Sequence, residues 1–488
     1  MNYKMLGRFI SQILAVEAVF MLPALIISAV SAELAACLGF VYTIALILAA
    51  AGILHALCRK APGLFGAREG MVCVSLGWIA LSLFGCLPFI FSGAIPRFFD
   101  AFFEIVSGFT TTGASVVTNV EALPKGILYW RSFSHWLGGM GVLVFLLAVA
   151  PAQGNDKGFT MHLMRAESPG PDVGKLVPKM RQTALILYVI YIVMTILNLI
   201  FLLAGKMDLL EAVCTAMGTA GTGGFGVRND SIASYSPYIQ NVTTVFMLLF
   251  GVNFSCFYLL LLRQLRSVIR DEELKLYLGL FAGATLVIFL QLWFKARDVY
   301  PTTEEALRHA AFQVSSIMTT TGFTTTDFDL WPTLSKGILM LLMVIGASAG
   351  STGGGLKCAR VLLLLKSLRR NIGQVLNPRR VQVVRSNGKM VDERVLANTN
   401  AYLAAYVTIV IVTFLLICPD GFSVETNLTA VLACFNNIGP GLAAVGPTCN
   451  FGIFSDFSKL VLSISMLAGR LEIFPMLVLL SRSTWTRR

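Results

Sequence analysis

Long apolar stretches alternate with short polar segments along the whole chain. A helix needs about 20 apolar residues to cross the hydrocarbon core of a bilayer. Ten stretches meet this length, at roughly residues 9–30, 34–57, 70–92, 127–150, 182–204, 238–262, 274–294, 334–365, 396–418 and 458–480. No cleavage signal of small residues follows the first stretch, so we expect a retained helix and not a signal peptide. The pattern predicts an all-α polytopic membrane protein.

Four further apolar segments are too short to cross. They run from Arg97 to Phe109, Asp208 to Met217, Glu304 to Ile317, and Val424 to Phe435. At about 1.5 Å per residue, such helices reach only about 15–20 Å, roughly half of a bilayer. Each begins with acidic residues, as expected near a helix N-terminus. We therefore predict four half-helices that enter the membrane and return.

A polar segment that contains glycine follows each half-helix. The four segments are Thr110–Ser115, Gly221–Phe225, Thr319–Thr324 and Asn436–Gly441. A single glycine of this kind is usually a loop turn. The order helix, half-helix, glycine segment, helix occurs four times, however, and a repeat over the whole chain indicates a fold more strongly than a local signal does.

The four half-helices would direct the negative ends of their dipoles at one place, which favours a cation there. Carbonyl and threonine oxygens of the glycine segments can replace the water around that cation. Non-helical backbone at this depth must be buried in protein or line a water-filled path. We therefore predict one ion-selective pore with fourfold pseudo-symmetry.

Composition supports the membrane class. Of 488 residues, 56% are hydrophobic and 13% are charged, which makes a soluble enzyme improbable. The net charge of +12 reflects topology, because 27 of the 38 Lys and Arg residues fall in loops on one side of the membrane. That side is expected to be cytoplasmic and to hold both termini. We expect membrane lipid as a partner and no nucleic acid.

Catalytic chemistry finds little support in the sequence. The ten cysteines are scattered without a Cys-x-x-Cys pair, and His55, His135, His162 and His309 are far apart. We expect buried cysteines, no catalytic residues and no covalently bound cofactor.

The most specific stretches are Phe109–Ser115, Trp130–Gly141, Thr319–Phe323, Asn436–Leu442 and Ala468–Glu472. They resemble the Trk/Ktr/HKT superfamily of potassium transporters, and most closely its bacterial TrkH-like membrane subunit. The resemblance implies four channel-like quarters, two extra N-terminal helices, and a homodimer with one pore in each subunit. The expected division is residues 1–66 for the extra helix pair, followed by pore repeats at 67–165, 166–270, 271–390 and 391–488.

The resemblance also implies a selectivity filter for potassium, the transported substrate. The residues expected to bind the ion are Thr111, Thr112, Gly113, Thr222, Gly223, Thr320, Thr321, Gly322, Asn437, Ile438 and Gly439. In that family a serine in the first quarter is associated with sodium transport, whereas this chain has glycine in all four. The second segment departs from the pattern, so Gly221 and Gly224 stay open as alternatives to Gly223.

A second glycine cluster interrupts the eighth span. It contains Gly346, Ser348, Gly350, Ser351, Thr352, Gly353, Gly354 and Gly355. Each glycine in a helix interior costs up to about 1 kcal/mol relative to alanine, so the helix should unwind here. A close helix contact between small residues is one explanation. The resemblance implies instead a movable gate below the filter.

Arg470 lies well inside the last span, where a charge is costly. An ion pair with a carboxylate on another helix is one explanation. The resemblance implies that Arg470 faces the pore below the filter as an electrostatic barrier.

The longest cytoplasmic loop is basic. It carries Lys366, Arg369, Arg370, Arg379, Arg380, Arg385, Lys389 and Arg394. Anionic lipid headgroups attract such a segment at about 1 kcal/mol per basic residue. The resemblance adds a soluble RCK-type regulator, analogous to TrkA, which would bind ATP/ADP or NAD/NADH and bias the gate through this loop.

These observations favour potassium uptake through a gated, channel-like pore in a bacterial inner membrane. An ion-coupled secondary transporter, which moves potassium with sodium or protons, is the alternative. A steady flux that follows the potassium gradient alone would distinguish the two.

Overall fold

The computed structural model describes residues 3–59, 67–141, 180–379 and 382–485. These residues are predominantly α-helical, and their one pair of short strands is β1 (Arg385–Ser386) with β2 (Lys389–Met390). The predicted all-α membrane fold is confirmed.

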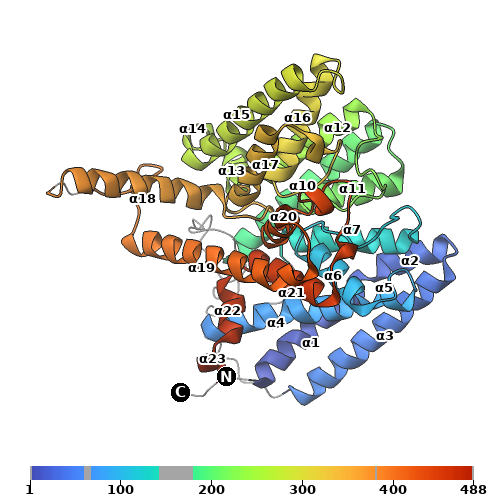
Figure 1. Cartoon of the computed structure of the whole chain (residues 1–488). Helices are drawn as coiled ribbons and strands as arrows, with labels where there is room; N and C mark the ends of the chain where they lie inside the picture. Colours follow the sequence, from blue (N-terminus) through green and yellow to red (C-terminus); the bar gives the residue numbers. More distant parts are fainter. Residues whose placement is uncertain (1–2, 60–66, 142–179, 380–381, 486–488) are drawn as a thin grey trace.

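The N-terminal helices form an antiparallel pair at one side of the molecule. α1 (Tyr3–Phe20) continues into α2 (Leu22–Val30), and α3 (Leu34–Leu57) returns alongside them (Figure 1). α1 packs on α4 and α2 packs on α7, so the pair covers the outside of the first repeat.

Four groups of helices follow, each with a long helix, a half-helix and a third helix. The first contains α4 (Ala67–Gly85) with α5 (Leu87–Phe91), α6 (Phe98–Phe109) and α7 (Lys125–Gly139). The second contains α10 (Met180–Ala204), α11 (Leu209–Gly221), and α12 (Pro237–Phe250) with α13 (Phe254–Leu261) and α14 (Leu265–Arg270). The third contains α15 (Glu272–Lys295), α16 (Thr303–Met318), and α17 (Thr333–Ile345) with α18 (Cys358–Leu376). The fourth contains α19 (Glu393–Ile417), α20 (Val424–Phe435), and α21 (Asp456–Arg470) with α22 (Phe474–Leu480) and α23 (Arg482–Trp485).

Six of the ten expected spans are continuous helices long and apolar enough to cross a membrane, within the described residues. The other four are not continuous. α7 ends at Gly139, and residues 142–150 of that expected span lie outside the described residues, as do the basic residues between 157 and 179. The glycine cluster separates α17 from α18 as expected, but the breaks at Gly251 and after Arg470 were not predicted.

Both unpredicted breaks have a local cause. α12 and α13 meet at 89°, where Gly251 approaches Tyr277 too closely for any side chain and Asn253 caps the amide of Ser255 at 2.9 Å. After α21, Glu472 and Ile473 adopt positive φ angles of 59° and 66°, which no helix accommodates.

The four half-helices are α6, α11, α16 and α20. Acidic residues occupy the first turn of each, as predicted. Three of the four also have a side-chain N-cap, from Asp208, Thr302 and Ser423, which satisfies an amide that the helix leaves free. α11 ends at Gly221 and not at Met217, because Gly218 packs on Phe323 and Gly221 packs on the backbone of His135.

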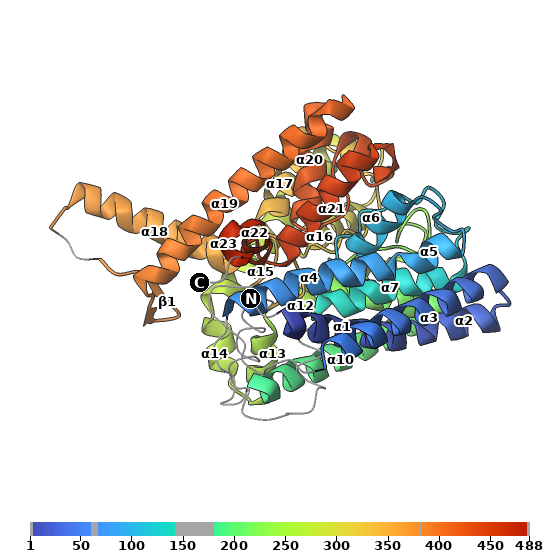
Figure 2. The same ribbon diagram turned by 90° about the horizontal axis from the view of Figure 1, so that it is seen from below.

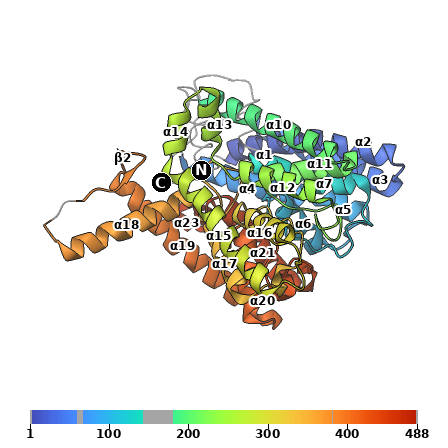
Figure 3. The same cartoon turned by 90° about the horizontal axis from the view of Figure 1, so that it is seen from above.

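α18 projects away from the rest of the molecule in all three views, and the chain returns through the strands to α19 (Figures 1, 2 and 3). This projecting helix follows directly from the glycine cluster.

Candidate ion pathway

Each half-helix ends in the same backbone motif. The amide five residues beyond a carbonyl near the helix end donates to it at 2.8 Å, which is the bond of a Schellman cap. The four bonds join Thr112 to Ser107, Gly223 to Gly218, Thr321 to Ser316, and Ile438 to Ala433.

The residue before each of these donors is left-handed. Thr111, Thr222, Thr320 and Asn437 have φ angles of 57°, 53°, 58° and 57°. Glycine is the usual residue at this position of the cap. A β-branched threonine there stores of order 1–3 kcal/mol of strain, and such strain is concentrated at functional sites. The left-handed conformation of these three threonines therefore indicates a functional site.

The residue after each donor is a glycine with positive φ. We call the four tripeptides Thr111–Gly113, Thr222–Gly224, Thr320–Gly322 and Asn437–Gly439 the ring segments. Their glycines have φ angles of 79°, 74°, 83° and 101°. Left-handed backbone of this kind is readily adopted only by glycine.

The ring segments close on one another. A Cβ added to any of the four glycines would lie within 3.0 Å of a carbonyl oxygen in the next segment. The pairs are Gly113 with Gly223, Gly224 with Thr321, Gly322 with Ile438, and Gly439 with Thr112. Each segment touches the following one and the fourth touches the first, so the predicted convergence around one axis is present.

This geometry corrects the expected register of the second segment. Gly224, and not Gly223, has the positive φ and the carbonyl contact that Gly113, Gly322 and Gly439 have. Gly223 corresponds instead to Thr112. The register differs from the expected one because α11 is four residues longer than the sequence suggests. Tertiary contacts hold Gly218 and Gly221 in the helix, although glycine alone favours a turn.

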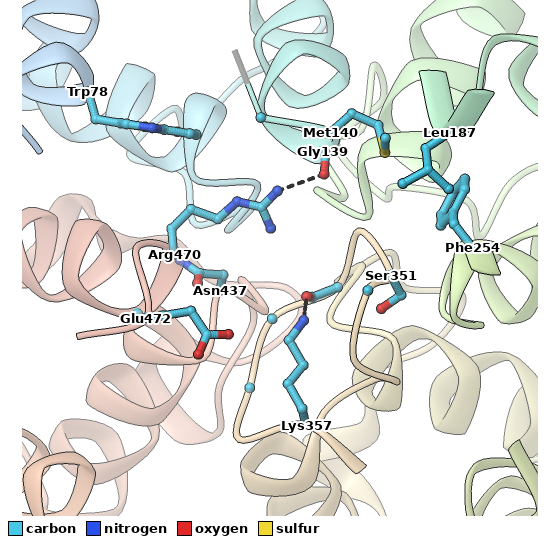
Figure 4. Close-up of a pocket in the computed structure, with 16 residues that line it drawn as sticks. Trp78, Gly139, Met140, Leu187, Phe254, Ser351, Lys357, Asn437, Arg470 and Glu472 are labelled. Carbon is cyan, nitrogen blue, oxygen red and sulfur yellow. Dashed lines mark hydrogen bonds between the residues drawn. The ribbon is translucent and has the colours of Figure 1, made fainter. Parts of the chain in front are cut away.

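A cavity lies on each side of the ring. The outer one is lined by all four ring glycines together with Arg131, Phe225 and Arg228. The inner one is lined by Asn437, by Lys357 and the glycines before it, and by Arg470 (Figure 4). The ring segments therefore separate the outer cavity from the inner cavity.

The segment between α17 and α18, residues 346–357, is the glycine loop. It is non-helical and largely buried, and its amides and carbonyls find partners on three sides. Ser348 donates its amide to the carbonyl of Gly251, and Gly350 accepts at 3.0 Å from the amide of Phe254. The amide of Gly354 donates to Oγ1 of Thr320 at 2.6 Å, which bonds the loop to the ring.

Two hydroxyls of the glycine loop donate to backbone carbonyls. Ser351 Oγ donates to the carbonyl of Ser348 at 2.6 Å, and Thr352 Oγ1 donates to that of Phe250 at 3.3 Å. Gly346 and Gly355 lie too close together for a Cβ on either. The loop is therefore a compact, hydrogen-bonded segment of non-helical chain. It is not a close contact between two continuous helices.

Arg470 reaches across the inner cavity. Its guanidinium donates to the carbonyl of Gly139 at 2.8 Å (Figure 4), to that of Thr352 at 2.8 Å, and also to that of Gly138. It thereby joins the end of α21 to the glycine loop and to the end of α7, directly below the ring.

Known proteins are similar to this chain over most of its length. Residues 38–485 match the family model described as TrkH, cation transport protein. The chain is 37% identical to the Trk system potassium uptake protein TrkH of Escherichia coli K12 over 432 residues, which cover 88% of each chain.

This chain belongs to the TrkH family.

Two further members extend the comparison. The Trk system potassium uptake protein TrkG of Escherichia coli is 33% identical and matches 86% of this chain and 85% of that protein. The crystal structure of the potassium transporter TrkH from Vibrio parahaemolyticus covers 100% of both chains with a TM-score of 0.87 and 32% identity. The TrkH fold thus extends over the full length of this chain.

Sequence reasoning missed residues that hold the glycine loop in place in this member of the TrkH family. Glu273, at the start of α15, accepts from the amides of Ala349 at 2.6 Å and Ala359 at 3.0 Å, so one carboxylate ties both arms of the loop. Lys357 is 2% exposed and donates to the carbonyl of Gly353. Only the high cost of burying a charge could have singled out these residues beforehand.

Proposed function

We propose that this protein takes up potassium through the ring segments, which act as a selectivity filter. The closed ring of four glycine contacts, with a cavity on each side, is the observation that carries the proposal. Two relatives named as potassium uptake proteins and a solved potassium transporter support it. The ion ligands would be carbonyl and side-chain oxygens of Thr111–Gly113, Thr222–Gly224, Thr320–Gly322 and Asn437–Gly439.

The half-helix dipoles support this choice of ion. α6, α11, α16 and α20 all end at the ring, so their negative ends meet there and favour a cation. Glycine at all four ring positions is the pattern that favours potassium over sodium, because no side chain narrows the ring.

The glycine loop would be the gate, and the hydrogen bond from Arg470 would hold it closed. The loop lies below the ring and is held by bonds from Thr320, Glu273 and Arg470. α18 follows the loop and projects from the molecule (Figure 1), so a regulator that binds α18 could move the loop.

An RCK-type nucleotide-binding regulator and anionic lipid would act on this face. Lys366 and Arg369 on α18, with Arg385 and Arg394 beyond it, provide the positive charge. We place both termini in the cytoplasm and the protein in a bacterial inner membrane. Copurification of such a regulator with the intact protein, lost on replacing Arg369 and Arg385 by glutamine, would test the docking face.

α18 would also contribute to a homodimer. Five large apolar side chains on it are 53–80% exposed, at the spacing of a stripe that packs on another helix. They are Leu365, Leu368, Ile372, Val375 and Leu376. The molar mass of the detergent-solubilised Ile372→Glu variant, compared with that of wild type, would test this role.

Purified protein in liposomes would test the main proposal. We expect potassium and rubidium to enter under their own gradients and sodium and lithium to enter much more slowly. A flux that requires a sodium or proton gradient would favour the coupled transporter instead. Gly322→Ala should remove the preference because its Cβ would meet the Ile438 carbonyl, whereas Gly279→Ala, where nothing lies within 4 Å, should not.

A further inference from the structure

Behind the ring, the first repeat contains an ion pair that is almost completely buried. Arg131 Nη2 lies 2.6 Å from Glu104 Oε1, with the side chains 2% and 0% exposed. Arg131 Nε also donates to Oε1 at 2.8 Å. Within the described part of the chain, no other ion pair has both partners so buried. Removing two charges from water costs about as much as such a pair returns, so stability alone is a weak explanation for it.

The pair is bonded to the chain that leaves the first ring segment. Ser115 Oγ donates to Glu104 at 2.9 Å, and the amide of Val116 donates to the same carboxylate at 2.9 Å. Ser115 lies two residues after Gly113. Glu104 therefore fixes the path of the backbone at the outer edge of the ring.

The pair also reaches the second ring segment. The guanidinium carbon of Arg131 lies 4.2 Å from the centre of the Phe225 ring, and Phe225 directly follows Gly224. Arg131 lines the outer cavity together with the four ring glycines. One guanidinium thus joins two neighbouring segments and faces the path by which a cation reaches them.

Two other repeats hold the same part of the chain with neutral groups. In the third, Thr325 Oγ1 lies 2.9 Å from His309 Nδ1. In the fourth, Thr429 Oγ1 accepts from the amide of Leu442 at 3.0 Å. The second repeat uses Arg228 and Glu211, which are 37% and 26% exposed and so partly screened by water. Only the first repeat, among these described contacts, places a fully buried charge pair at the ring.

We propose that Arg131 and Glu104 are positioning residues for ion selectivity. Arg131 braces the first ring segment against the second, and Glu104 cancels its charge so that cations can approach. This inference rests on the proposed potassium uptake. It predicts two separable effects. Holding the two ring segments in place depends on the forked geometry of the guanidinium, whereas entry of cations depends on the net charge of the pair.

Three variants in proteoliposomes separate the two effects. Arg131→Lys keeps both charges but loses the fork, so potassium influx should persist while the ratio of potassium to sodium influx falls several-fold. Glu104→Gln leaves the positive charge uncompensated and should lower influx of both ions about tenfold, the effect of one unit charge about 12 Å from the ion in a medium of dielectric constant about 20. The double variant Glu104→Gln/Arg131→Gln should recover influx but keep the lowered ratio.

Glu304→Gln is the matched control. It makes the same chemical change in an ion pair with Arg308 on another half-helix, where the carboxylate is 58% exposed. It should leave influx and ion ratio unchanged. Because an unpaired buried arginine can prevent folding, Arg131→Lys and the double variant decide the matter if Glu104→Gln is not recovered.

The outcomes are distinct. A lowered ion ratio in both Arg131→Lys and the double variant supports the inference. A wild-type ratio in either folded variant overturns it while leaving the proposed uptake intact. A wild-type protein that does not prefer potassium overturns the proposed function and this inference with it.

Discussion

The amide of Gly354 donates a 2.6 Å hydrogen bond to the side-chain oxygen of Thr320. Thr320 is the left-handed residue of the third ring segment, and Gly354 belongs to the glycine loop below it. The contact couples the two parts of the pathway, because the loop cannot leave its place without freeing a buried amide. The third ring segment and the glycine loop are thus bonded directly in this structure.

Thr320→Val removes the acceptor while keeping the shape of the side chain. A neutral hydrogen bond contributes about 0.5–1.5 kcal/mol, so the loop should open roughly two to tenfold more often. Unregulated potassium influx in liposomes should rise by that factor. Thr320→Ser, which keeps the hydroxyl, is the control and should resemble wild type. Equal influx in all three proteins would show that this bond does not restrain the loop.

Arg470→Ala should raise influx further. The guanidinium bonds to Thr352 and Gly139, and hydrogen bonds to charged groups contribute about 1.5–3 kcal/mol. Its loss also removes a positive charge from the inner cavity. We expect an increase of roughly tenfold or more in potassium influx.

Arg470→Lys separates these two contributions. Lysine keeps the charge, but its compact ammonium lacks the wide fork of donors with which the guanidinium reaches both elements. An influx near that of Arg470→Ala would identify the bonds as the restraint, and an influx near wild type would identify the charge. Unchanged or lost influx in folded Arg470→Ala protein would contradict the barrier role.

Gly224→Ala tests the corrected register. Its Cβ would meet the carbonyl oxygen of Thr321, and its φ of 74° disfavours any side chain. We expect loss of the preference for potassium over sodium. Gly226→Ala, two residues further on, needs only small shifts of its neighbours and should keep the preference. If the two variants show the same ratio of potassium to sodium influx, Gly224 is not the counterpart of Gly113, Gly322 and Gly439.

The sequence predicts the repeats and the ring because both depend on local features. Apolar length separates spans from half-helices. Glycine close to threonine marks the first three ring segments, and glycine close to asparagine marks the fourth. The register of the second segment could not be read in this way, since Gly218 and Gly221 are helical only through contacts with Phe323 and His135. The restraints on the glycine loop are also non-local. Glu273 lies 76 residues before Ala349, and no pattern along the chain connects them.

Glu17 raises a separate question of stability. It lies on α1, is 1% exposed, and neither carboxyl oxygen has a hydrogen-bond partner within the described residues. Its Oε1 approaches Gly85 so closely that a Cβ there would lie 2.9 Å away. An ionised carboxylate in this place would cost several kcal/mol, so the neutral acid is the form that the fold accommodates.

Two substitutions test this assignment by thermal unfolding in detergent. Glu17→Gln keeps the shape and the neutral polar group, so its free energy of unfolding should stay within about 1 kcal/mol of wild type. Glu17→Leu removes an unsatisfied polar group and should stabilise by about 1–3 kcal/mol. Glu33→Gln is the contrasting control and should destabilise. Glu33 accepts from the amides of Lys125 at 2.7 Å and Gly126 at 3.3 Å through different oxygens, and glutamine has only one acceptor oxygen. Strong destabilisation by Glu17→Gln would instead mean that the carboxylate is ionised and held by a partner.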